Sequence, residues 1–193
     1  MHAPVAPAAF AEAVRALTAA RLRSEVQTEE MRAPQRLAPW AYAMALRVVV
    51  GEVELATGRL VLLHDPDGQE AWGGTLRLVG YASTELDSEM LRDPLLPEVG
   101  WSWLTDALAE CGAQYSAIAG TVTQTASTRF GELAGPDGPG GLQGTGEIEV
   151  RASWTPLDAN ALGRHLRAWA EMMGTAAGLP PPGVTALPSP AAG

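Results

Sequence analysis

Residues 147–154 read EIEVRASW and alternate strictly between polar and apolar side chains. Ile148, Val150, Ala152 and Trp154 occupy every second position, with charged or hydroxyl side chains between them. Because successive side chains of a β-strand point to opposite faces, this pattern predicts a strand with one buried and one solvated face. We therefore expect a β-sheet whose covered face is built from such stripes.

Upstream segments repeat this strand pattern. Residues 40–50 (WAYAMALRVVV) place large side chains on one face and mainly alanines on the other, which predicts a second face that other atoms approach closely. The apolar run at 59–64 and the stretch 75–86 complete an antiparallel meander with it. A weaker strand is expected within 114–130, rich in Thr, Ala and Gly.

The connecting segments carry turn residues and charges. Residues 51–58 (GEVELATG) predict a turn or irregular connection, and residues 65–68 (DPDG) place Pro and Gly where a tight turn requires them. Residues 21–39 are highly charged and contain two prolines, which predicts irregular or edge-strand structure. Residues 134–146 are rich in glycine and predict a flexible connection.

Three segments have apolar side chains at helical spacing. The first begins near Phe10 and lasts about three turns, and the second runs from about residue 98 to residue 110. The third is expected to begin with Thr155 as N-cap and Pro156 at the first helical position. Its apolar stripe consists of Leu162, Leu166, Trp169 and Met173.

Together these elements predict a single α+β domain over residues 8–178, in the order α-βββ-α-ββ-α, with flexible Pro- and Ala-rich tails at 1–7 and 179–193. An antiparallel sheet of about five strands, with helices packed on one face, would bury every apolar stripe. The order of elements resembles the type III secretion chaperone-like fold, in which a small domain holds another protein. That resemblance is topological, and topology does not determine function.

Charge and composition restrict the class of protein. The 193 residues carry 13 basic and 22 acidic side chains, a net charge of −9 at pH 7. The acidic side chains are concentrated in residues 51–110, and such a surface repels phosphate, which argues against nucleic acid as the principal ligand. No run of about 18 apolar residues occurs, and the first residues lack the features of a secretory signal. We therefore expect a cytoplasmic protein that does not enter a membrane.

Two tryptophans lie close together in the second predicted helix. Trp101 and Trp103 are about 200° apart around a helix axis, so they cannot share one face. Trp103 is expected in the core, although Leu104 with Leu108 is the alternative core stripe. Trp101 then faces a rim or a partner, because tryptophan is enriched at binding hot spots.

Histidine and cysteine offer little catalytic chemistry here. His64 follows an apolar strand beside Asp65, a pairing that suits a metal or a general base, but a structural histidine at a strand end is the simpler interpretation. His165 is expected to be partly exposed on the last helix. Cys111, the one cysteine, excludes an intrachain disulfide and is expected to be a small buried side chain. We assign no catalytic residue, no cofactor and no metal.

Three blocks of sequence carry a family resemblance: RLVLLHDPDGQEAWGGTLRLV, DPLLPEVGWSWLTDAL and EIEVRASWTP, in that order. Together they resemble the actinobacterial family known as domain of unknown function 3000, over roughly residues 8 to 180. The resemblance implies a cytoplasmic protein of GC-rich bacteria, and it assigns no activity to any residue.

Two hypotheses of function follow from these observations. The first is a non-catalytic interaction module, adaptor or chaperone-like, whose partner is another protein or a second copy of the chain. Its candidate interface residues are Trp101, Glu98, Asp93, Trp72 and His64. The second is a small-molecule-binding protein or enzyme with a pocket near His64 and Trp101, in which Trp72 and Tyr81 are walls and Asp65 lies at the polar end.

Overall fold

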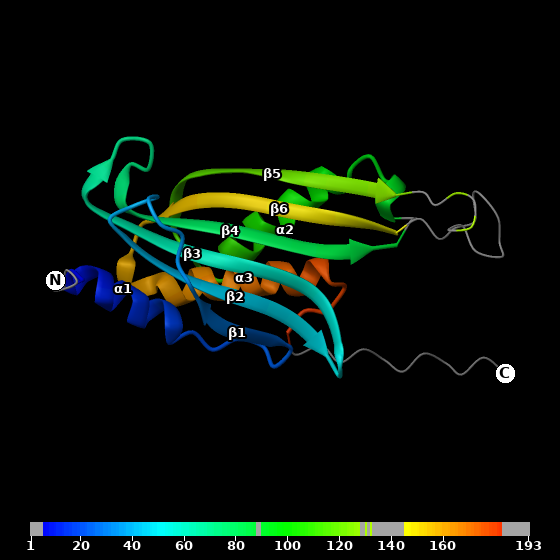
Figure 1. Ribbon diagram of the computed structural model, residues 1–193, viewed down its shortest axis with the longest axis horizontal. Coiled ribbons are helices and arrows are strands. Elements are labelled where there is room, and N and C mark those ends of the chain that lie inside the picture. Colours follow the sequence, from blue (N-terminus) through cyan, green and yellow to red (C-terminus); the bar gives the residue numbers. More distant parts are fainter. Residues whose placement is uncertain (1–5, 88–89, 128–129, 131, 133–144, 183–193) are drawn as a thin grey trace.

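The computed structural model describes residues 6–87, 90–127, 130, 132 and 145–182 (Figure 1). It contains one sheet and three α-helices, as the α+β prediction requires. The helices are α1 (Ala8–Thr18), α2 (Leu96–Glu110) and α3 (Leu162–Ala176), with short 3-10 turns η1 (Met90–Arg92) and η3 (Ala159–Ala161). The strands are β1 (Val26–Met31), β2 (Trp40–Val50), β3 (Val53–Gln69), β4 (Gly74–Leu86), β5 (Tyr115–Ser127) and β6 (Thr145–Pro156).

The sheet has six strands, not five, in the order β1-β2-β3-β4-β6-β5, and every neighbouring pair is antiparallel. The additional strand is β1, which pairs with β2 along one edge of the sheet. Its sequence VQTEEM does not alternate between apolar and polar side chains, and five of its six residues are exposed. An edge strand needs no buried stripe, so periodicity alone did not separate it from irregular chain.

All three helices pack on one face of the sheet, and Figure 1 shows α2 and α3 behind the strands. The alternating stripes of β2 and β6 point into this layer, so Met44, Val150 and Trp154 belong to one core with the helices. The indoles of Trp154 and Trp169 lie 5.7 Å apart between β6 and α3. This confirms the predicted covered face.

A row of small residues crosses the middle of that face. Gly80, Ala152 and Gly120 are register partners on β4, β6 and β5. A Cβ on Gly80 would lie 2.5 Å from the ring of Trp169, and one on Gly120 would lie 2.5 Å from the ring of Trp101. Both glycines therefore make room for an indole that packs directly on the sheet backbone.

The opposite face carries a smaller apolar cluster. Ala43, Val61, Leu63 and Trp72 are buried there, and Ala33 and Ala38, which precede β2, pack against them. The chain itself thus covers the alanine face at the β2–β3 end of the sheet, as the small side chains predicted. The rest of this face, over β4, β6 and β5, is not covered by a helix (Figure 1).

Two predicted boundaries were wrong. Gly51 and Glu52 form the expected turn, but β3 already includes residues 53–58 of the expected connection. It also includes the expected turn at 65–68, and the chain turns at 70–73 instead. Residues 65–68 have no register partner on β4, so this irregular stretch of the hairpin accommodates the proline and the positive φ of Gly68.

The last helix also begins later than predicted. Thr155 is not an N-cap, because β6 continues to Pro156 and the Thr155 hydroxyl donates to the carbonyl of Trp72 at 2.6 Å. Asp158 caps η3 instead by accepting from the Asn160 amide. Of the predicted glycine-rich connection at 134–146, Thr145 and Gly146 belong to β6. Residues 134–144 and most of the predicted tails lie outside the described residues.

Candidate functional site

The edge formed by β5 differs from the edge formed by β1. β5 is 13 residues long, reads YSAIAGTVTQTAS and contains no charged residue and no proline. By contrast, β1 is six residues long and carries Glu29 and Glu30, which protect an edge against unwanted pairing. In the described part of the chain β5 pairs only with β6, so one side of its backbone faces outward.

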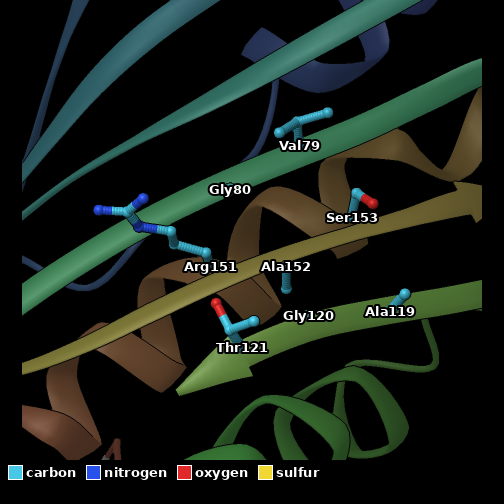
Figure 2. Close-up of a pocket in the computed structure, with 8 residues that line it drawn as sticks. All are labelled: Val79, Gly80, Ala119, Gly120, Thr121, Arg151, Ala152 and Ser153. Atoms are coloured by element: carbon cyan, nitrogen blue, oxygen red, sulfur yellow. The ribbon is translucent and has the colours of Figure 1, made fainter. Parts of the chain in front are cut away.

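A shallow depression of about 370 Å³ lies next to this edge, on the face without helices (Figure 2). Figure 2 shows its residues on three adjacent strands, with the Arg151 side chain reaching away over β4. The lining residues are Val79, Gly80, Ala119, Gly120, Thr121, Arg151, Ala152 and Ser153. On the β5 side only Ala119, Gly120 and Thr121 separate the depression from the free edge.

Arg77 holds the beginning of β5 in an irregular conformation. Its side chain lies on the same face and is 7% exposed. One guanidinium nitrogen donates to the carbonyl of Ala117 at 2.8 Å and to the Thr155 hydroxyl at 3.1 Å, and the other donates to Ser153 at 2.8 Å. Ala117 has φ of +48° within a register shift between Ser116 and Ala119. Arg77 thus ties β4 to a bulge on β5 across β6.

We expect Arg77→Met to loosen this bulge. The variant removes three hydrogen bonds from the guanidinium while it keeps a side chain of similar length, so the free energy of unfolding should fall by about 1–2 kcal/mol. Amide exchange in residues 115–121 should become faster than in wild type. Arg59→Met is the matched control, because Arg59 is exposed on the same face. Equal amide exchange rates in Arg77→Met and wild type would contradict the conclusion that Arg77 stabilises the bulge on β5.

A second concave region lies on the helical side, between α2 and α3. It has a volume of about 660 Å³ and includes Trp103 and Cys111. Both side chains are partly buried and pack against the main core. The alternative stripe is the correct one, because Leu104 and Leu108 have no exposed surface. Burial also raises the pKa of the Cys111 thiol.

A family model described as a protein of unknown function, DUF3000, matches residues 6–185. The chain belongs to this family. The match covers every described helix and strand, so the β5 edge, the depression and the α2–α3 groove all lie within the DUF3000 region. No curated protein and no solved structure matches the chain. Within the described residues of this DUF3000 protein, no helix is long and apolar enough to cross a membrane.

The structure places Trp101 on the DUF3000 sheet itself. Its ring lies against Gly120 of β5, and the side chain is partly buried by its own chain. Glu98 is exposed in the first turn of α2. The carboxylate of Asp93 accepts from the Leu95 amide at 2.9 Å, which organises the turn before the helix. These three residues therefore lie near the start of α2.

Trp72 and His64 lie elsewhere in the DUF3000 fold. Trp72 belongs to the small cluster on the face without helices. His64 faces the helices, where its ring stacks on Phe10 at 5.8 Å and its Nδ1 lies 3.0 Å from the carbonyl oxygen of Thr75. The five candidate interface residues are thus not brought together, and the sheet separates His64 from Trp72. Among the described residues, no group of three His, Cys, Asp or Glu side chains is placed to hold a metal.

His165 is fully buried, whereas a partly exposed position was predicted. The Trp154 indole N–H donates to its Nδ1 at 3.0 Å, so the ring is a neutral acceptor in the core. Burial lowers the pKa of His165 from 6.5 to about 4. It has a structural role between β6 and α3, away from the β5 edge.

Sequence reasoning missed Arg77 and the importance of β5. An arginine at an alternate position of a strand gives no sign that it is buried. For β5 a signal was present, because residues 115–127 form the longest part of the predicted strand regions without a charged side chain. The absence of charge in β5 is informative only because β5 is an edge strand. The sequence did not show this position, which follows from the order of strands in the structure.

Proposed function

We propose that this DUF3000 protein is a non-catalytic protein-interaction module that binds an extended segment of a partner protein along β5. The observation that carries the proposal is the long, uncharged and exposed edge strand. Free N–H and C=O groups on such an edge are a template for strand addition, and natural proteins ordinarily protect edges with charges or coverage. The opposite edge, β1, has that protection.

The depression supplies a means of selecting the partner. In strand addition the main chain provides affinity, while pockets for individual side chains provide specificity. A side chain from an added strand has to pass only the small residues Ala119 and Gly120 to reach the depression. The apolar side chains of Val79 and Ala119, with the hydroxyl of Ser153, favour an uncharged side chain there. We therefore propose a partner segment that is extended and free of charge at its centre.

The arrangement of elements supports the same kind of activity. The order α-βββ-α-ββ-α predicted from the sequence resembles that of type III secretion chaperone-like domains, which hold another protein, and we propose a related topology for the DUF3000 chain. We also propose a cytoplasmic setting, in keeping with a chain that has one cysteine and a net charge of −9.

Lysines on the β5 edge are expected to abolish partner binding. Thr121, Thr123 and Thr125 are exposed on β5. A photo-reactive benzoylphenylalanine at Thr123 should form an adduct with the partner in cells, and Thr121→Lys with Thr125→Lys should lower its yield at least about tenfold. The reason is that an added strand would have to bury two ammonium groups at its pairing surface.

The control places the same photo-reactive residue at Thr57, an exposed position on the same face of β3, away from the edge. Adducts there should be absent or insensitive to the lysines. Equal yields at Thr57 and Thr123, or an adduct at Thr123 that survives both lysines, would refute strand addition along β5. Melting temperatures of the variants should match that of the parent protein.

A further inference from the structure

A concave region of about 460 Å³ lies between the end of α1 and the beginning of α3. α1 packs against η3 and against α3 there, as Figure 1 shows. The two helices approach closely, since a Cβ on Gly163 would lie 3.0 Å from the carbonyl oxygen of Ala16. The volume of this region, which we call the α1–α3 site, is within the range of sites that bind small molecules.

The α1–α3 site is lined by three arginines. Arg21 follows α1, whereas Arg164 and Arg167 belong to the first half of α3. All three side chains are exposed, and arginine stays protonated at neutral pH. Asp158 is the one acidic residue of the lining, which therefore has a net charge of +2 in a chain whose net charge is −9. The positive charge is thus concentrated in one concave part of an acidic protein.

These positive charges are not neutralised within the described part of the chain. Arg21, Arg164 and Arg167 make no ion pair within 4.0 Å there. The Arg164 guanidinium donates to the carbonyl of Gly112 at 3.2 Å, which holds this side chain against the end of α2. The side chains of Arg21 and Arg167 make no hydrogen bond to the described residues. The carboxylate of Asp158 caps η3 instead of pairing with an arginine.

The positions of the arginines are unfavourable for the protein alone. Arg164 and Arg167 are three residues apart on α3, and like charges at this spacing on a helix repel each other. Arg164 also lies in the first turn of α3, where the helix dipole disfavours a positive charge. Arg21 brings a third positive charge to the same region. A bound anion would reverse both effects, and local arrangements of this kind are expected at functional sites.

We propose that the α1–α3 site binds the phosphate group of a small phosphorylated molecule through Arg21, Arg164 and Arg167. The guanidinium group matches the oxygens of a phosphate, and a phosphate monoester carries nearly two negative charges near neutral pH. It therefore balances the net charge of the lining, whereas a monocarboxylate leaves one positive charge without a partner.

The overall charge of the chain favours a small ligand over a large one. A nucleic acid or an anionic membrane would extend beyond the α1–α3 site and would be repelled by a protein with a net charge of −9. A small phosphorylated molecule would contact only the site itself. This inference is independent of strand addition along β5, because it concerns other residues on other elements.

Titration of the nitrogen-15-labelled full chain with inorganic phosphate, at constant ionic strength, tests the proposal by NMR. Amide signals of residues 16–21 and 158–167 should shift saturably, with a Kd in the millimolar range or tighter, while those of β5 should not shift. Arg21→Gln with Arg167→Gln should raise the Kd at least about tenfold, because two charge-assisted hydrogen bonds to phosphate are lost. The same spectra report whether the variant is folded.

The matched control is Arg15→Gln with Arg32→Gln, which removes the same charge from two exposed positions outside the α1–α3 site. Its Kd for phosphate should stay within about twofold of the wild-type value. Asp158→Asn keeps a side-chain oxygen that can cap η3 but removes the negative charge, so it should lower the Kd about threefold. Acetate in place of phosphate should bind at least about fivefold more weakly to the wild-type chain.

Three results would each overturn the proposal: phosphate shifts that do not saturate, equal Kd values in the two double variants, and equal affinity for acetate and phosphate. The photo-adduct at Thr123 should form with the same yield in Arg21→Gln with Arg167→Gln as in the parent protein. Loss of phosphate binding and loss of strand addition can therefore be distinguished.

Discussion

Trp169→Ala is expected to lower the free energy of unfolding by about 3–5 kcal/mol, which is the range for removal of a fully buried aromatic side chain. Trp169 has no exposed surface and packs on Trp154 and on the space that Gly80 leaves open. The cavity cannot close by a movement of β4, because the sheet register holds that strand on both sides. The melting temperature should fall on the order of 10 °C.

Urea unfolding followed by far-UV circular dichroism measures this loss. Val99→Ala is the control within the helical layer, because Val99 is 40% exposed and its truncation should change stability by less than about 0.5 kcal/mol. The loss in free energy of unfolding for Trp169→Phe should be smaller than for Trp169→Ala and larger than for Val99→Ala, since a smaller ring fills part of the space. If Trp169→Ala lowered the free energy of unfolding by less than about 1 kcal/mol, the packing of Trp169 on Trp154 and over Gly80 would be contradicted.

Acidification is expected to destabilise the protein through His165. The pKa of His165 is lowered from 6.5 in the unfolded chain to about 4 in the fold, because burial disfavours the imidazolium. The folded state thus binds fewer protons than the unfolded state between these two values. Stability from the neutral ring is complete above pH 6.5 and is lost as the pH falls toward 4. The expected loss over this interval is about 3 kcal/mol.

The measurement is the free energy of unfolding at pH 7.0, 5.5 and 4.5 for wild type and His165→Gln. The variant should be less stable at pH 7.0, because the Trp154 indole loses a well-placed acceptor. Its stability should nevertheless vary less with pH over the same interval. If the free energy of unfolding varied equally with pH in the two proteins, His165 would not be the group responsible for the loss of stability. The Glu25 carboxyl titrates in a lower range, since Arg23 lowers its pKa to about 2.

Much of the covered face was predictable because its side chains obey one periodicity. The alternation in residues 40–50 and 147–154 identified β2 and β6, and the predicted stripe of α3 is buried. His165 was missed because its neighbours in that stripe are apolar and a polar side chain suggests solvent. Its burial depends on one hydrogen bond from Trp154, a residue on another element, and local periodicity contains no information about that contact.

The candidate site was less accessible to prediction for a topological reason. Consecutive strands usually pair, so the chain order favours β5 beside β4. In the structure β6 lies between them, and this insertion makes β5 the edge. Arg77 illustrates the same point, since its partners on β5 and β6 are 40 and 76–78 residues away in the chain. The residues were visible in the sequence, but their positions relative to an edge were not.

The insertion of β6 also has a consequence for the growing chain at the ribosome. β5 has no hydrogen-bonded neighbour until residues 145–156 have left the exit tunnel, because β6 is its only partner strand in the described chain. Until then β4 is the outermost strand of the nascent sheet, and Arg77 lacks the hydroxyls of Ser153 and Thr155. The β5 edge of the sheet is therefore completed only after β6 has been made.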